Sequence, residues 1–168
     1  MDKENKTENK VLNITSKKEE AFLRKRVPHL NLSHENKKEL KTLIKNMWKI
    51  MKENNGIGLS ANQIGLHKRL FVAQVPDENG RPKFYAIINP EIIKSSSQKM
   101  PSEEGCLSVP LETTGIVERP EKITLQGFNA EGKKIKIKAW GLLARIFQHE
   151  LDHLNGMLFI DRVKKTKK

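Results

Sequence analysis

The segment His-Glu-Leu-Asp-His at residues 149–153 limits the possible folds more than any other part of this sequence. Its two histidines are four residues apart, so on an α-helix they share one face and both imidazoles can bind one metal ion. Leu142 and Ile146 precede His149 by seven and three residues, which predicts that this face points into the core. The segment therefore favours a buried metal-binding helix, ended by the Asn-Gly pair at 155–156, over a surface helix with two unrelated histidines.

A third protein ligand is needed, because two imidazoles alone do not hold a metal firmly while leaving one position for water. A histidine six residues after His153 would extend the motif, but Phe159 stands there and cannot ligate. The other histidines lie in loop or helix-start contexts that favour solvated side chains. Cys106, the single cysteine, is the preferred candidate, although taken alone it would more often be a core residue or a nucleophile paired with a histidine.

An amphipathic helix is predicted over residues 40–51, where apolar side chains recur at helical spacing. Ser33 is a candidate N-cap, and Asn-Asn-Gly at 54–56 is a stop signal. The glycine-rich segment 56–65 is predicted to be a loop without a regular element of any length, because its glycines permit unusual backbone angles. The backbone of such a loop can come close to a ligand.

Short β-strands are predicted at 70–75, 84–89, 123–128 and 134–139, the last two joined by a turn at 129–132. The order of one helix, several strands and one helix favours an α+β fold over alternating βαβ units. A chain of 168 residues suits one domain. We therefore expect a single α+β domain in which small mixed or antiparallel sheets pack around the C-terminal metal-binding helix, with one amphipathic helix on the N-terminal side.

Composition argues against several classes of protein. No apolar run approaches the ~18 residues of a membrane span, and the charged first ten residues lack the apolar stretch of a secretory signal. A single cysteine cannot form an intrachain disulfide. We expect a cytoplasmic protein, or one of an organelle matrix if a targeting segment has been removed, with a flexible charged arm at 1–10, a folded domain at 11–162 and a basic tail at 163–168.

The net charge of +12 and the sequence pI near 9.8 raise the local concentration of polyanions around the protein at low salt. The lysines are nevertheless spread along the chain, with short clusters at 133–138 and 162–168, and nine aromatic residues are few for stacking on bases. A solvated basic surface is therefore favoured over a specific nucleic-acid site.

Three separated segments resemble motifs of one family, the peptide deformylases. They are GIGLSANQ at 56–63, EGCLS at 104–108 and QHELDH at 148–153, which are similar to the family's GxGLAAxQ, EGCLS and QHExDH motifs in the same order. The resemblance extends from about residue 11 to residue 161. Ser60 departs from the family, which usually has alanine there, and its extra hydroxyl is expected to affect packing more than chemistry.

The resemblance implies a metal-dependent hydrolase that removes the formyl group from formyl-methionine at the N-terminus of newly made polypeptides and releases formate. Cys106, His149 and His153 would hold one divalent metal. By resemblance this metal is ferrous iron, with zinc, nickel or cobalt as substitutes, since such a donor set accepts several first-row ions. Glu150, which is not a ligand, would serve as the base.

The resemblance also assigns roles around the metal. The Gln63 side-chain amide and the Leu107 backbone N–H would stabilise the oxyanion. Five residues would bind substrate, three through their backbone and two through the wall of a methionine pocket: Ile57, Gly58 and Gly105, then Leu142 and Ile146. Glu104, Arg119 and Asp152 are predicted to support the ligands, because buried metal-binding imidazoles usually donate their second N–H to an oxygen.

The expected partners are formyl-methionyl chains as they emerge from the ribosome. The distributed lysines and those at 164–168 could favour binding near ribosomal RNA, and we expect a monomer without membrane contact. Two alternatives stay open at this point: an HExxH metallopeptidase that cuts internal peptide bonds, and a non-catalytic basic RNA-binding protein with a structural metal site.

Overall fold

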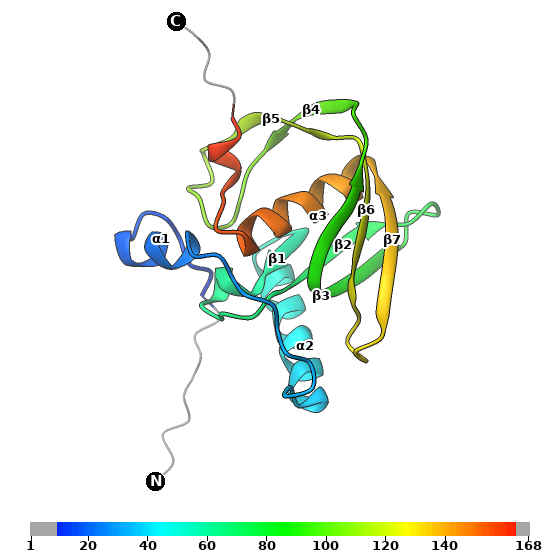
Figure 1. Cartoon of the computed structure of the whole chain (residues 1–168). Coiled ribbons are helices and arrows are strands. Elements are labelled where there is room, and N and C mark those ends of the chain that lie inside the picture. Colours follow the sequence, from blue (N-terminus) through cyan, green and yellow to red (C-terminus); the bar gives the residue numbers. More distant parts are fainter. Residues whose placement is uncertain (1–9, 164–168) are drawn as a thin grey trace, which may run out of the picture.

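The computed structural model describes residues 10–163. Helix α3 (Gly141–Leu154), which carries the predicted metal-binding motif, lies in the middle of the molecule with strands on several sides of it (Figure 1). The predicted arm and tail fall outside the described residues, apart from Lys10 and Val163. Lys10 forms an ion pair with Glu19 at 2.7 Å, and Val163 packs in a small apolar cluster.

The described residues form three α-helices, two 3₁₀ turns and seven β-strands. The remaining helices and turns are α1 (Lys17–Leu23), α2 (Lys37–Glu53), η1 (Ala61–Ile64) and η2 (Phe159–Asp161). The strands are β1 (Gly58–Ser60), β2 (Leu70–Pro76), β3 (Pro82–Ser95), β4 (Lys99–Glu104), β5 (Gly115–Pro120), β6 (Lys122–Phe128) and β7 (Lys134–Trp140). None of these helices has the length and apolar character needed to cross a membrane.

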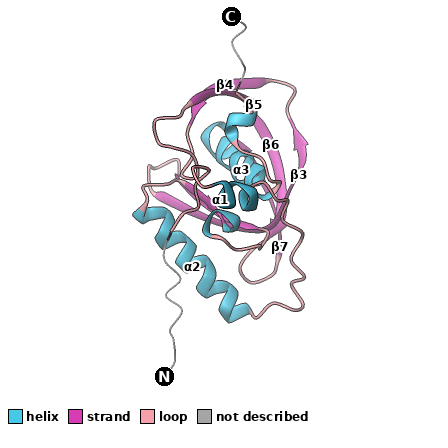
Figure 2. Cartoon of the chain, turned by 90° about the vertical axis from the view of Figure 1, so that its left-hand side faces the viewer, coloured by secondary structure: helices cyan, strands magenta, loops and turns pink. Residues whose placement is uncertain are grey.

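Five strands form one sheet in the order β1-β2-β3-β6-β7, and β4 pairs with β5 alone. Every pairing is antiparallel. One face of the large sheet packs on α3 and the other packs on α2. Figure 2 shows α3 between the β4–β5 pair and the large sheet, with α2 beyond the sheet. The predicted α+β domain around a C-terminal helix is therefore confirmed, with antiparallel rather than mixed sheets.

Strand β2 joins the cores on the two faces of the sheet. Phe71 and Ala73 pack with α3, whereas Leu70 and Val72 pack with α2. Successive side chains of a strand point to opposite faces, so the continuous apolar run at 70–73 is the pattern of a strand buried on both sides. Strand β2 therefore lies between the two long helices, with α3 on one face and α2 on the other.

Asn36, not Ser33, caps helix α2. The Asn36 Oδ1 accepts hydrogen bonds from the backbone N–H groups of Lys38 and Glu39 at 2.9 and 3.2 Å. Asparagine caps as well as serine, and Asn36 stands directly before Lys37, the first residue of the helix. The predicted stop signal is correct, because the helix ends at Glu53.

Helix α3 ends where predicted, at the Asn-Gly pair. Gly156 has a φ of +76°, and a Cβ there would collide with the backbone of Arg24. A side chain at this position would push the end of α3 away from the segment that follows α1. The glycine therefore lets the C-terminal end of the metal-binding helix pack closely against the N-terminal part of the domain.

Several short elements are not predicted from the sequence. The segment 56–65 contains β1 and η1, because β1 pairs with the buried strand β2, and only Gly65 in this segment has a positive φ. Strand β4 is mostly exposed. In β5 the inward positions are Val117 and the charged Arg119, so neither strand shows the apolar alternation that marks a strand. Helix α1 has seven residues, too few to show a helical period.

Candidate metal centre

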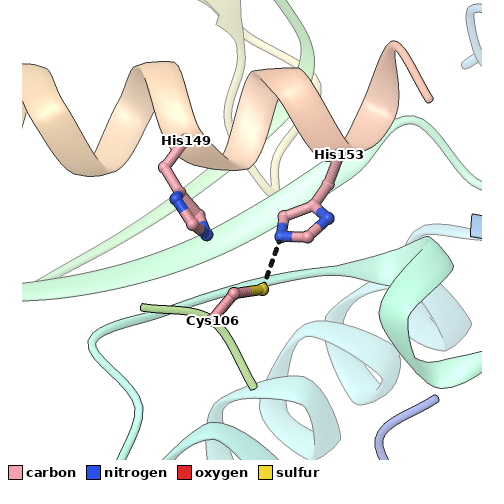
Figure 3. A group of neighbouring side chains, drawn as sticks. All are labelled: Cys106, His149 and His153. Carbon is pink, nitrogen blue, oxygen red and sulfur yellow. Dashed lines mark hydrogen bonds between the residues drawn. The ribbon is translucent and has the colours of Figure 1, made fainter. Parts of the chain in front are cut away.

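Helix α3 directs His149 and His153 towards the loop after β4, where Cys106 lies (Figure 3). The Cys106 sulfur and the His153 Nε2 are 3.1 Å apart. The ligand atoms of the three residues all lie within 4.8 Å of one another. The structure thus brings together the three side chains that the sequence indicates as metal ligands.

These three donors fit a divalent first-row metal. Bonds of about 2.3 Å to sulfur and about 2.1 Å to nitrogen put neighbouring ligands of a tetrahedron roughly 3.6 Å apart, and the observed separations lie within 4.8 Å. One thiolate and two imidazoles are donors that iron, cobalt, nickel and zinc all accept. Three protein ligands leave the fourth corner for water or substrate, as in catalytic sites.

Two neighbours hold the His149 ring in place. Its Nδ1 lies 3.0 Å from Glu104 Oε2, and the ring stacks on Phe159 with 6.3 Å between centroids. Burial alone would lower the pKa of His149, but hydrogen bonds with Cys106 and Glu104 raise it to about 10. Glu104 and Cys106 therefore favour a positive charge at this ring. A metal cation bound to the ring would supply such a charge.

His153 is more deeply buried and has fewer partners. It is 1% exposed, and within residues 10–163 its Nδ1 has no hydrogen-bond partner. Burial, followed by the charges of His149 and Arg119, lowers its pKa, so the ring is neutral and its Nε2 lone pair can bind a metal. The expectation that each imidazole donates to an oxygen therefore holds for His149 but not for His153.

A buried network of charged side chains lies behind His149. Arg119, 3% exposed, donates to Glu104 at 2.7 and 2.9 Å and to Asp152 at 2.8 Å. Burial alone would raise the pKa of Glu104, but Arg119 and His149 hold that pKa well below its usual range. Glu104 therefore remains charged and can orient the imidazole. The predicted trio points into the protein and not into solvent.

Two arginines that the sequence reasoning missed extend this network. Arg145 Nη1 donates to Glu104 at 2.6 Å, and Arg162 donates to Asp152 at 2.6 and 2.7 Å. Arg145 precedes His149 by four residues, and this helical spacing is a signal that could have identified it. Arg162 follows a 3₁₀ turn and carries no comparable local signal.

Glu150 lies at the cavity wall and is 3% exposed. A Cβ on Gly58 would collide with the Glu150 Oε1, so the glycine lets this carboxylate approach strand β1. Burial raises the pKa of Glu150 to about 7, although the charge of His149 and a hydrogen bond from Ser60 oppose the rise. A carboxyl group with a pKa near neutrality can accept a proton and return it.

Gln63 is buried beside the sulfur atom. Its Nε2 donates to the Ser108 hydroxyl at 3.0 Å and lies 3.7 Å from the Cys106 sulfur, while its Oε1 accepts from the Ser60 N–H at 2.9 Å. With 2% of its surface exposed, this side chain is not the solvated loop glutamine that composition alone would favour. Leu107 follows Cys106 and is partly buried in the cavity wall.

A cavity of about 350 Å³ opens beside Cys106 and His149. All five predicted substrate-binding residues line it: Ile57, Gly58, Gly105, Leu142 and Ile146. Ile146 is 4% exposed, but Leu142 is 51% exposed at the cavity rim. The prediction that Leu142 points into the core is therefore wrong, because its side chain faces the open cavity and not the packed sheet.

Comparison with known proteins decides the family. The family model described as polypeptide deformylase matches residues 11–168. The chain belongs to the peptide deformylase family. The peptide deformylase of Halothermothrix orenii is 48% identical over 126 residues, which cover 75% of this chain and 79% of that protein.

Solved structures of peptide deformylases share the fold. A probable peptide deformylase from Synechococcus phage S-SSM7 has a TM-score of 0.81 at 37% identity, with 91% of this chain and 98% of that chain covered. A Met-Ala-Ser-bound class I type b peptide deformylase from Acinetobacter baumannii has a TM-score of 0.80 at 32% identity, with 92% and 97% covered.

Family membership establishes the reaction class. Peptide deformylases are metal-dependent hydrolases that remove the N-formyl group from nascent polypeptides, and this chain is such an enzyme. The family predicted from the three motifs is therefore confirmed. A general HExxH metallopeptidase and a non-catalytic RNA-binding protein are not favoured, since the relatives matched are peptide deformylases.

Proposed function

We propose that this peptide deformylase hydrolyses the formyl amide of formyl-methionyl N-termini with Glu150 as the base, beside a metal ion held by Cys106, His149 and His153. The observation that carries the proposal is the place of Glu150. Its buried carboxylate lies in the wall of the same cavity as Cys106 and His149, so one small substrate group can meet all of them.

The proposed native metal is ferrous iron, with zinc, nickel or cobalt as substitutes. A divalent ion bound here would supply a Lewis acid that lowers the pKa of a water molecule and polarises the formyl carbonyl. The support is the donor set of one thiolate and two imidazoles, which several first-row ions accept. An accessible thiolate ligand is sensitive to oxidation, so activity and metal content are best measured without oxygen.

Three groups of the chain act directly on the reacting atoms in this proposal. Glu150 takes a proton from the attacking water and passes it to the departing amine, so that one carboxylate serves both steps. The Gln63 Nε2 and the Leu107 backbone N–H donate to the oxyanion that forms on the formyl oxygen. The buried position of Gln63 supports this role, because its side chain is held by Ser60 and Ser108.

The substrate chain is proposed to bind in an extended form along the cavity. Backbone groups of Ile57, Gly58 and Gly105 would pair with its peptide groups, and Leu142 and Ile146 would contact the methionine side chain. The Met-Ala-Ser peptide bound to the Acinetobacter baumannii relative is the kind of peptide that deformylation leaves. This relative supports methionine as the first residue of the substrate.

We further propose that the protein works as a cytoplasmic monomer near the ribosome. The net charge of +12 supports this placement, because a basic surface concentrates around ribosomal RNA at low salt. Deletion of residues 163–168 should reduce co-sedimentation with ribosomes in low salt. Unchanged co-sedimentation would show that the tail has no part in the association.

The residue roles can be tested with Glu150→Gln, assayed anaerobically for formate release from a formyl-Met peptide. We expect turnover to fall by at least about 100-fold with bound metal unchanged, because Glu150 is not a ligand. Glu53→Gln, an exposed carboxylate on α2, is the control and should keep full turnover. Retained turnover in Glu150→Gln, or cleavage of internal peptide bonds by the native protein, would contradict the proposal.

A further inference from the structure

Ser60, the residue that departs from the family motif, contacts the proposed base directly. It is fully buried at the end of β1. Its hydroxyl lies 2.9 Å from the Glu150 backbone oxygen and 2.8 Å from Glu150 Oε2, so a single donor serves two oxygens of one residue. The expectation that this hydroxyl affects packing more than chemistry does not fit these contacts.

Strand geometry explains why β1 reaches Glu150 twice. Gly58 and Ser60 are two residues apart, so they face the same side of the sheet, towards α3, while Leu59 faces the α2 core. The Glu150 Oε1 lies against Gly58, and Oε2 lies against the Ser60 hydroxyl. The carboxylate is thus placed by two positions of one strand.

Ser60 acts from behind the cavity. Gly58 and Glu150 line the cavity, but Ser60 does not, so its hydroxyl does not meet the substrate. Within residues 10–163, Ser60 is also the only hydrogen-bond donor to the Glu150 carboxylate. A buried carboxylate with one donor depends on that donor for its orientation.

We propose that Ser60 is a positioning residue that holds the Glu150 carboxylate in the orientation needed for proton transfer. The inference rests on the proposed role of Glu150 as base. Loss of the hydroxyl frees the carboxylate to turn away from the reacting water. This reduces the stabilisation of the transition state without changing the groups that bind the peptide. Turnover should therefore change and the Michaelis constant should not.

The test compares Ser60→Ala and Ser60→Thr with the native enzyme, anaerobically, by kcat, KM and metal content. Ser60→Ala should lower kcat by about tenfold, with KM and metal content within about twofold. Ser60→Thr keeps the hydroxyl and should recover most of the lost kcat. Ser96→Ala removes another hydroxyl that donates to a backbone oxygen and should leave all three values unchanged.

Thermal unfolding gives a readout that does not depend on activity. Ser60→Ala should lower the melting temperature more in the native background than in Glu150→Ala, because only the native protein offers the carboxylate contact. An unchanged kcat in Ser60→Ala, or a joint loss of metal and rise in KM, would overturn the inference. If instead Glu150→Gln keeps its turnover, the proposed role of Glu150 fails first.

Discussion

The two faces of the large sheet are stabilised by different chemistry. The α2 face is apolar, with Met47 and Leu59 fully buried. On the α3 side an apolar cluster lies beside charged groups that are almost as buried, such as Arg119 at 3% and Asp152 at 5% exposure. Apolar contacts are non-directional, whereas a buried charge needs each partner in place. Substitutions on the α3 side, which carries the site, should therefore be more disruptive than substitutions in the α2 core.

The largest effect is expected at the loop that faces α3. Cys106→Ala removes the proposed sulfur ligand, so we expect loss of bound metal and a fall in formate release of more than about 1,000-fold. Metal analysis and the assay on one anaerobic sample check this. On the other face, Met51→Leu conserves volume and should change neither value. A full equivalent of metal in Cys106→Ala would contradict the assigned ligands.

The charged network should dominate stability on the α3 side. Arg119→Met leaves Glu104 and Asp152 buried with fewer positive partners, and we expect the free energy of unfolding to fall by about 3–5 kcal/mol. Urea denaturation of the metal-free protein measures it. A loss below about 1 kcal/mol would show that the buried charges on the α3 side contribute little to the free energy of unfolding.

A change in the apolar core should separate stability from activity. Met47→Ala on the α2 face removes a fully buried side chain, and we expect a loss of about 3 kcal/mol in the free energy of unfolding. The kcat of the folded fraction should not change, because Met47 does not line the cavity that Cys106, His149 and Glu150 share. A tenfold or so lower kcat at full folding would show that the two faces are coupled.

The sequence predicts the apolar side of the molecule well. Helix α2, expected over 40–51, spans Lys37–Glu53, and the strand expected at 70–75 is the doubly buried strand β2. Burial of apolar side chains leaves a helical period in α2 and a run of apolar residues in β2, which is why these elements can be read locally. Strand β4 is polar and mostly exposed, and β5 buries the charged Arg119, so neither leaves such an apolar pattern.

The site is predicted from the sequence only in part. The HExxH spacing and the family motifs indicate Cys106, His149 and Glu150, which the structure places together around one cavity. The contact of Ser60 with Glu150 joins residues separated by 90 positions, and Arg162 reaches Asp152 from beyond the helix. No local pattern encodes such contacts, because they depend on how distant segments pack.

The smallest effect is expected at the rim of the charged network. The Arg162 side chain is 39% exposed, and Asp152 keeps its bond to Arg119 without it, so Arg162→Ala should cost about 1 kcal/mol of unfolding free energy. The loss of unfolding free energy in Arg162→Ala should become smaller in about 1 M added salt, because exposed charges are screened. Lys49→Ala, which breaks an exposed ion pair on α2, is the matched control and should cost less than about 0.5 kcal/mol. A loss near that of Arg119→Met would show that the buried Asp152 needs Arg162 as much as it needs Arg119. The partly exposed Arg162 would then be an essential part of the network.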